Sequence, residues 1–476
     1  MPFTFNESTI PELQQEMESG RLTAKHLTMK YLEQIANHNT IINAVIEVNP
    51  DALHIAEGLD TERTVKGPRG PLHGIPVLVK DNIDTADKTH TTAGSIALKN
   101  NYAATDAFIV KKLREAGAVI LGKTNLTEWA NFMTEGMPNG YSSLGGQVKN
   151  PYSPGVFDTG GSSAGTGAGI AANFAAAGIG TETSGSILSP ASSNSIVGIK
   201  PTVGLWSRTG IIPISSTQDT AGPMTRTVED AAVLLGLLAA NDPEDPATSL
   251  LSNGATTDYT SGLDKNGLNE TRLGVSRDYL DGLTDDEIEL IDNALEDMRN
   301  LGAEVIDPVS LTTDLNDLNV MLHEFKNGVN AYLKNVSGNV PVHTLEEVIQ
   351  YNKQHEESAL KYGQSVLVRS DEKSGRLTEA EYINARLNDM KQSQEQGIDR
   401  VMKEHQLDAL IFANNYGAGI AAKAGYPSIT VPAGYTKAGK PVGITFTGRA
   451  FTEQKLITLA YAYEQATNHR KTPKLD

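Results

Sequence analysis

Residues 106–122 read DAFIVKKLREAGAVILG, and this stretch predicts an amphipathic helix that stops at Gly117 and leads into a β-strand. The same order returns at 285–306, DDEIELIDNALEDMRNLGAEVI. There Thr284 and Glu287 form a capping-box start, and Gly302 is the stop. Helix–glycine–strand units of this kind predict an α/β fold whose sheet has much parallel pairing.

Strands are predicted near both ends of the chain, with a helical segment between them. IPVLVKDNI at 75–83 predicts a buried strand whose exit carries Lys80. Further strands are predicted at 407–413, 428–435 and 442–448, a last helix at 453–468, and long helices within 314–405. We therefore expect a single large domain over 1–476, with a central mixed, mostly parallel, twisted sheet flanked by helices. Its parts are a core at 20–240, a variable and largely helical insertion at 241–405 that shapes the pocket, and C-terminal strands and a helix at 406–476.

The composition excludes several classes of function. The 476 residues carry a net charge of -18, which argues against direct binding of nucleic acid or of an anionic membrane. The chain has no cysteine, so disulfides, thiolate zinc sites and cysteine nucleophiles are excluded. No window approaches 18 consecutive apolar residues, and the N-terminal sequence lacks a signal-peptide pattern. We therefore expect a cytoplasmic protein; its oligomeric state stays open.

Two glycine- and serine-rich stretches follow each other, DTGGSSAGTGAG at 158–169 and TETSGSILSP at 181–190. Neither binds phosphate by a known spacing, because the P-loop lysine is missing and Ile170 replaces the third glycine of a dinucleotide fingerprint. His355-Glu356 begins an H-E pair, but position 359 is alanine, so the zinc motif H-E-x-x-H is absent. No metal or other cofactor is expected.

Two kinds of serine chemistry stay open from the residues alone. Residues 161–165, GSSAG, match the G-x-S-x-G elbow around Ser163, which would need a downstream histidine. The downstream histidines, each in a charged helical setting typical of a solvated side chain, are His323, His343, His355, His405 and His469. In the other hypothesis Lys80 is the base, because a desolvated lysine loses its charge and can activate one serine through another. Amide N–H groups around Gly185-Ser186 would then bind the developing oxyanion.

Eight blocks resemble the amidase signature family in content and in order. They are LHGIPVLVKDNID (72–84), GKTNLTEWANF (122–132), DTGGSSAGTGAGIAA (158–172), GTETSGSILSPA (180–191), VGIKPTVGLWSRTGIIPIS (197–215), QDTAGPMTRTVEDAA (218–232), AGYPSITVPAGY (424–435) and VGITFTGRAFTEQKL (442–456). The resemblance covers 20–240 and 405–470. It implies the amidase signature fold and hydrolysis of carboxamides through an acyl-enzyme, without a cofactor.

Carried over by motif, the resemblance implies a Ser–cis-Ser–Lys triad. Lys80 is then the base, Ser162 the bridging serine with a cis peptide bond, and Ser186 the nucleophile. The implied oxyanion hole consists of the backbone N–H groups of Thr183, Ser184, Gly185 and Ser186. Ser163 is implied to support Lys80 by hydrogen bonding.

Other residues of these blocks have two interpretations. Residues 128–133, EWANFM, are either pocket wall or plain core. Gln218, Asp219 and Arg226 are either scaffold or contacts to substrate.

The family pattern is not matched everywhere. Ser184 stands where relatives often have glycine or aspartate, and Leu188 where many, including glutamine amidase subunits, have arginine. QDTAGPMTR and GYPSITVPAGY look closer to the peptide-amidase-like branch, which removes ammonia from C-terminal peptide amides. We expect a small-molecule or peptide amide as substrate and no obligate protein partner. The alternatives are an ammonia-producing subunit of a glutamine-dependent amidotransferase and a non-catalytic amide-binding relative.

Overall fold

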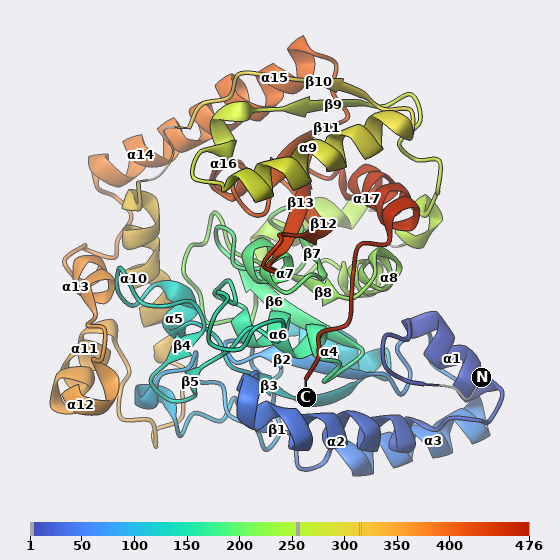
Figure 1. Ribbon diagram of the computed structural model, residues 1–476. Helices are drawn as coiled ribbons and strands as arrows, with labels where there is room; N and C mark the ends of the chain where they lie inside the picture. The colour runs from blue at the N-terminus through green and yellow to red at the C-terminus, as the bar shows by residue number, and fades with distance from the viewer. Residues whose placement is uncertain (1–3, 254–257, 314, 316, 476) are drawn as a thin grey trace.

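A sheet of 11 strands crosses the described part of the molecule (Figure 1). The computed structural model describes residues 4–253, 258–313, 315 and 317–475. In sheet order the strands are β1 (Val45–Val48), β3 (Val119–Thr124), β2 (Pro76–Lys80), β6 (Ala177–Glu182), β8 (Thr220–Thr225), β7 (Val197–Lys200), β12 (Ser428–Tyr435), β13 (Pro441–Thr447), β11 (Ala409–Ala413), β9 (Arg272–Val275) and β10 (Glu304–Ile306). Strands from both ends of the chain thus lie in the same sheet, which confirms a single large α/β domain.

The pairing of the strands is mixed. Parallel pairs join β3, β2 and β6 on one side of the sheet and β11, β9 and β10 on the other. The pairs between these groups, and the pair β1–β3, are antiparallel. Parallel pairing is therefore less extensive than predicted. The physical reason is the connections: neighbours such as β12 and β13 are joined by a short turn, which can only produce an antiparallel pair.

The two helix–glycine–strand units form as the sequence predicts. α4 (Phe108–Glu115) and α9 (Asp285–Asn300) end next to Gly117 and Gly302, whose φ angles of 82° and 94° close each helix. Thr284 caps α9, and the side chain of Glu287 bonds back to the cap backbone. Each unit delivers a strand with a parallel neighbour, β3 beside β2 and β10 beside β9.

Helices flank the sheet. α6 (Ala164–Ala171) and α7 (Leu188–Ser193) pack on each other and on the central strands. α4, α8 (Val228–Leu238) and α17 (Glu453–Thr467) pack in a row, while α2 (Ala24–Ile42) and α3 (Ala52–Lys66) cover the β2–β3 end. α1 (Ile10–Glu18) and α16 (Ala418–Ala424) complete this layer of elements around the sheet. No helix in the described ranges is long and apolar enough to cross a membrane.

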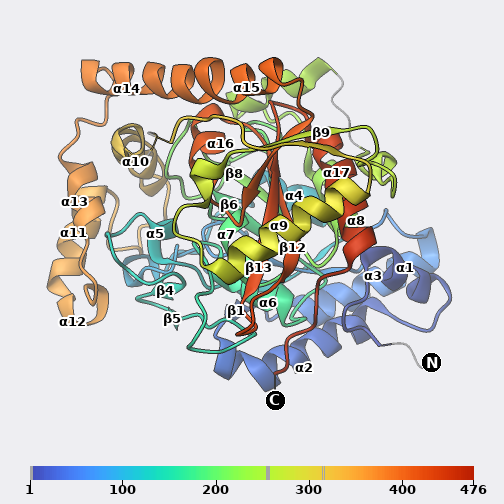
Figure 2. The same cartoon turned by 45° about the horizontal axis from the view of Figure 1, so that its top comes forward.

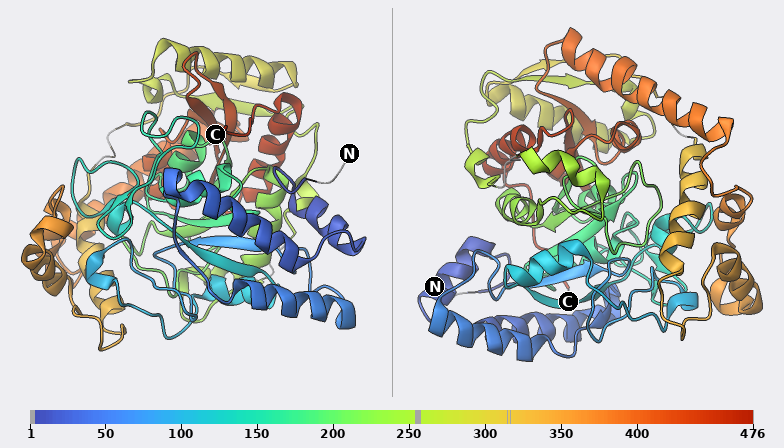
Figure 3. Two further views of the ribbon diagram at one scale, coloured as in Figure 1. Left: turned by 60° about the horizontal axis from the view of Figure 1, so that its bottom comes forward. Right: turned by 180° about the vertical axis from the view of Figure 1, so that it is seen from behind.

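The segment 241–405 is largely helical. Its helices are α10 (Asn319–Leu333), α11 (Leu345–Gln354), α12 (Glu356–Ala359), α13 (Ser365–Asp371), α14 (Ala380–Met390) and α15 (Asp399–Glu404). α10 to α13 form a column along one side of the molecule, and α14 and α15 extend across the top of Figure 2 (Figures 2 and 3). The segment also contributes β9 and β10 to the sheet. The division at 240 and 405 stays a prediction.

Candidate active site

Lys80 and Thr181 lie side by side at the carboxyl ends of two parallel strands. β2 ends at Lys80 and pairs with β6, in the register Val79 to Ile179. The Lys80 side chain is fully buried, and its Nζ donates to Ser162 Oγ (2.8 Å), Thr181 Oγ1 (2.9 Å) and the Thr181 carbonyl oxygen (3.2 Å). Carboxyl ends of parallel strands are where open α/β sheets usually bind ligands.

The surroundings of Lys80 favour a neutral amine. Burial lowers the pKa of Lys80 to about 7, against the opposing effect of the charges on Glu182 and Asp219. No carboxylate of the described residues forms an ion pair with Nζ; its partners are hydroxyl and carbonyl oxygens. A neutral amine could donate both N–H bonds to Thr181 and keep its lone pair for the hydroxyl of Ser162. Lys80 can therefore accept a proton near neutral pH.

The fold brings the two glycine-rich stretches together. The N–H of Ser163 donates to the carbonyl oxygen of Ser186 at 3.1 Å, and the Gly161–Ser162 peptide bond is cis, as the resemblance implies. Gly165 allows this close packing: a Cβ there would lie 2.3 Å from the carbonyl oxygens of both Ala44 and Asn125. The glycines thus let α6 and its serines approach the neighbouring backbone.

Ser163 supports Lys80 only indirectly. Its Oγ donates to the carbonyl oxygen of Thr181 (3.1 Å) and accepts from the N–H of Thr181 (3.2 Å), with no bond to Lys80. The predicted direct hydrogen bond is therefore wrong, because Thr181 stands between the two side chains. The sequence reasoning missed Thr181, which only tertiary pairing of β2 with β6 reveals.

A histidine partner for Ser163 is missing from the described residues. No histidine lines either of the cavities beside Thr183, and Ser163 is bonded to Thr181 instead. The prediction that the downstream histidines are solvated is wrong for His323. That ring is 1% exposed and lies on α10, 3.8 Å from carboxylate oxygens of Glu379 and Glu381.

The turn after β6 presents Ser186 with a free hydroxyl. Its Oγ has no hydrogen-bond partner among the described residues, and the side chain opens onto a cavity. The N–H groups of Thr183, Ser184 and Ser186 likewise donate to no other described group. The N–H of Gly185 does not stay available, because it donates to Glu182 Oε1 at 2.8 Å. The implied oxyanion hole therefore loses one of its four donors in this structure.

Glu182 organises this turn and was not identified from the sequence. Its Oε2 accepts from the N–H groups of Ile187 (2.7 Å) and Leu188 (3.0 Å), at the N-terminus of α7. A carboxylate there satisfies unpaired N–H groups and the helix dipole. The available signal was an acidic residue at the end of a buried strand just before a short helix.

We expect Glu182→Gln to weaken both the turn and the basicity of Lys80. The neutral amide is a poorer acceptor for three N–H groups, which should lower the free energy of unfolding by about 1–3 kcal/mol. Because the Glu182 charge raises the pKa of Lys80, its loss should move the pKa below about 7. Denaturant unfolding and the pH dependence of kcat/KM measure these effects; an acid limb that stays in place would contradict this electrostatic role.

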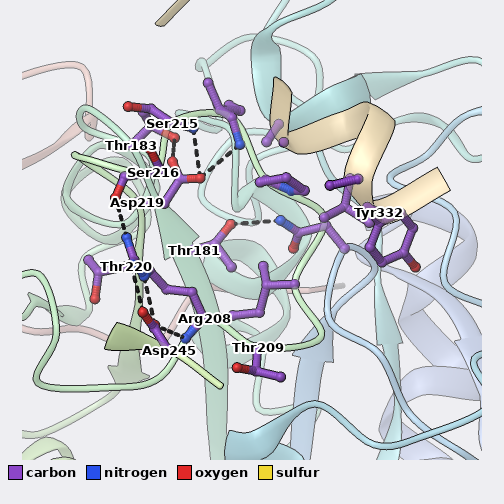
Figure 4. A pocket seen from close by; sticks show the side chains of 18 of the residues that line it. Thr181, Thr183, Arg208, Thr209, Ser215, Ser216, Asp219, Thr220, Asp245 and Tyr332 are labelled. Carbon is purple, nitrogen blue, oxygen red and sulfur yellow. Dashed lines mark hydrogen bonds and ion pairs between the residues drawn. The ribbon is translucent and has the colours of Figure 1, made fainter. Parts of the chain in front are cut away.

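Two cavities meet at Thr183. The nucleophile cavity, about 400 Å³, is lined by Ser186, Ser184, Gln218 and Lys423, among others. The second cavity, about 600 Å³, is lined by Asn82, Thr181, Arg208 and Tyr332, among others (Figure 4). The residues common to both are Ala130, Thr183 and Ile214.

Charged groups in the second cavity are held by protein partners (Figure 4). Asp219 accepts from the Thr183 hydroxyl at 2.6 Å, and burial raises its pKa to about 6. Arg208 forms a salt bridge with Asp245, Nη2–Oδ1 2.6 Å. Arg226 is elsewhere, bonded to backbone oxygens of Ser8 and Ala175, so a scaffold role fits it. Among the described residues, no three His, Asp or Glu side chains gather as a metal would require.

The cavity walls come from two segments that the sequence only outlined. Residues of α5 (Glu128–Asn131) and its C-cap Phe132 line the nucleophile cavity, which confirms a wall role for 128–133. The φ angles of Trp129, Ala130 and Asn131 are 51°, 53° and 70°, a left-handed turn that non-glycine residues seldom adopt. Met321 and Tyr332 on α10 line one cavity each, so the insertion shapes the pocket as expected.

Comparison with known proteins identifies the family. The family model named Amidase matches residues 26–419. The chain belongs to the amidase family. It is 43% identical to an Arabidopsis thaliana protein named "Probable amidase", over 99% of this chain and 92% of the relative. The crystal structure of a peptide amidase from Stenotrophomonas maltophilia is 43% identical with a TM-score of 0.94, and covers 100% of both chains.

A third relative is similar over less of its length. This relative, a glutamyl-tRNA(Gln) amidotransferase subunit from Methylobacillus flagellatus, is 40% identical over 301 residues, 63% of this chain and 59% of the relative. The similarity to the amidases, by contrast, extends over nearly the whole chain. The amidase described here is therefore a hydrolase of amides, as the sequence motifs predict.

Proposed function

We propose that this amidase acts through Lys80, Ser162 and Ser186, and that its substrates are C-terminal amides of peptides. The buried Lys80 carries the proposal. Its Nζ lies 2.8 Å from Ser162 Oγ, without a carboxylate partner to keep it charged. All three groups come from one chain, so the enzyme needs no partner subunit to complete this set, and we propose that it works as such in the cytoplasm.

In the proposed reaction, protons move along the three side chains. Neutral Lys80 takes the proton of Ser162, and Ser162 takes that of Ser186 as its Oγ attacks the amide carbonyl carbon. The C–N bond then breaks, and the proton returns along the same path to the leaving nitrogen. Water hydrolyses the resulting ester on Ser186 by the same route. The lysine needs to be neutral only at the moment of attack, which its pKa of about 7 permits.

The negative charge on the carbonyl oxygen would be held by backbone N–H groups. We propose Thr183, Ser184 and Ser186 as donors, since their N–H groups are free. Gly185 supports this hole in another way than the family resemblance implies: its bond to Glu182 fixes the turn that aims the others. Preorganised donors of this kind typically contribute about 3–4 kcal/mol each to the transition state.

The substrate class rests on the nucleophile cavity and on the relatives. The Stenotrophomonas maltophilia structure with the same fold over the full length is described as a peptide amidase. The amidotransferase alternative has weaker support, since those subunits match 63% of this chain and Leu188 replaces the arginine common among them. A non-catalytic role is disfavoured because the lysine and both serines are present and two of them are already hydrogen-bonded.

Ammonia release from three substrates tests the proposal: a C-terminal peptide amide, free glutamine and a simple aryl or aliphatic amide, with Ser186→Ala as the blank. We expect release chiefly from the peptide amide and none above background in the variant. Preference for glutamine would favour the amidotransferase function instead. Equal release by wild type and variant would overturn the assignment of Ser186.

A further inference from the structure

Gln218 is a buried amide whose partner is not in the protein. The residue is 2% exposed and lies in the loop just before β8. Its main-chain N–H donates to the carbonyl oxygen of Ser215 at 3.3 Å, but its side-chain amide has no hydrogen-bond partner among the described residues. A buried side-chain amide without a partner costs about 1–3 kcal/mol. The group that completes its hydrogen bonds must therefore enter from the space that it lines.

That space is the nucleophile cavity. Gln218 lines it together with Ser186 and Ser184. The neighbouring Asp219 is unlike Gln218, because its carboxylate is occupied by the Thr183 hydroxyl and by the N–H groups of Ile214 and Ser215. Asp219 holds the loop, and Gln218 is the member of the pair that is left for a ligand.

The chemistry of a primary amide selects its ligand. Gln218 offers one acceptor and two donors, which complement the N–H and C=O of a peptide group. The reacting carbonyl oxygen is directed to the N–H groups after β6, and the leaving nitrogen to Ser162. The acyl part of the substrate is what remains for the nucleophile cavity. In a peptide amide, the acyl part carries a peptide group one carbon atom away from the reacting carbonyl.

We infer that Gln218 is the specificity residue that binds the peptide group next to the scissile carboxamide. This inference rests on the proposed function and adds to it the group by which a peptide amide is distinguished from a simple amide. A simple aliphatic or aryl amide lacks this peptide group, so it leaves the Gln218 amide unpaired in the complex.

Two matched substrates test the inference, N-acetylphenylalaninamide and 3-phenylpropanamide. They share the ring, its methylene and the carboxamide, and differ in the acetamido group. Gln218→Met keeps the length of the side chain and removes its hydrogen bonding. We expect a roughly 10- to 100-fold loss of kcat/KM on the acetylated substrate, mainly through KM, and little change on the other.

A second buried glutamine provides the control. Gln364 is 6% exposed, accepts from Asn352 Nδ2 (3.0 Å) and donates to the Ile349 carbonyl oxygen (3.3 Å), so its bonds are already made inside the protein. Gln364→Met should lower the thermal midpoint and leave the ratio of kcat/KM between the two substrates as in the wild type.

The outcomes separate the two proposals. Equal losses on both substrates in Gln218→Met, or no loss on either, would overturn the role of Gln218 alone. A wild-type enzyme that hydrolyses neither substrate would overturn the proposed function and this inference with it.

Discussion

Replacement of Ser186 by alanine is expected to lower kcat for amide hydrolysis by roughly 10⁴-fold or more, because no covalent intermediate can then form. The Ser186 hydroxyl has no partner among the described residues, so its removal breaks no structural bond and the free energy of unfolding should change little. Steady-state kinetics and denaturant unfolding of the same preparation measure both effects. An enzyme that loses stability along with activity would point to a structural serine instead.

Ser189 gives a matched control for this variant. It lies three residues further on, at the start of α7, and lines neither of the two cavities beside Thr183. Ser189→Ala should keep kcat within a few-fold of the wild type. Comparable losses in both variants would mean that the turn as a whole, and not the Ser186 hydroxyl, is what the reaction requires.

Lys80→Met is expected to lower kcat/KM by roughly 10²- to 10⁴-fold, the usual contribution of a general base. It should also remove the pH dependence near neutrality. Because burial lowers the pKa of Lys80 to about 7, the wild-type lysine is neutral above that pH and charged below it. Wild-type kcat/KM should therefore rise with pH through about 7 and level off above it, and residual activity of the variant should lack this rise.

Lys200 is the control for burial as such. It is also fully buried, on β7, with a pKa lowered by burial to about 8, and its Nζ donates to the carbonyl oxygen of Tyr426. Lys200→Met should preserve the rise near pH 7. If that rise disappears in Lys200→Met and persists in Lys80→Met, Lys80 is not the base.

Motif order predicted much of the candidate site, because local blocks carry their own signal. Lys80, Ser162 and Ser186 each stand in a stretch whose glycines or flanking strand restrict the local backbone. The structure brings two of them into direct contact and joins the serine stretches through the bond from Ser163 to Ser186. The helix–glycine–strand pattern likewise predicted the α/β class, since it reports on neighbouring elements.

What depends on tertiary packing was missed or wrong. The role of Thr181 needs β6 beside β2, and the bond of Gly185 to Glu182 needs the turn itself. Neither arises from spacing along the chain. His323 was predicted to be solvated from its charged neighbours, yet the packing of α10 against α13 and α14 buries it. The extent of antiparallel pairing also depends on connections that no single stretch encodes.

The central claim is that Ser186 forms the covalent intermediate. It is tested most directly by treating the wild-type protein with a fluorophosphonate and locating the adduct by tandem mass spectrometry. The account predicts a single adduct on Ser186, formed faster as the pH rises through about 7 because Lys80 becomes neutral. An adduct on Ser163 or on another serine, or no adduct at all, would contradict it.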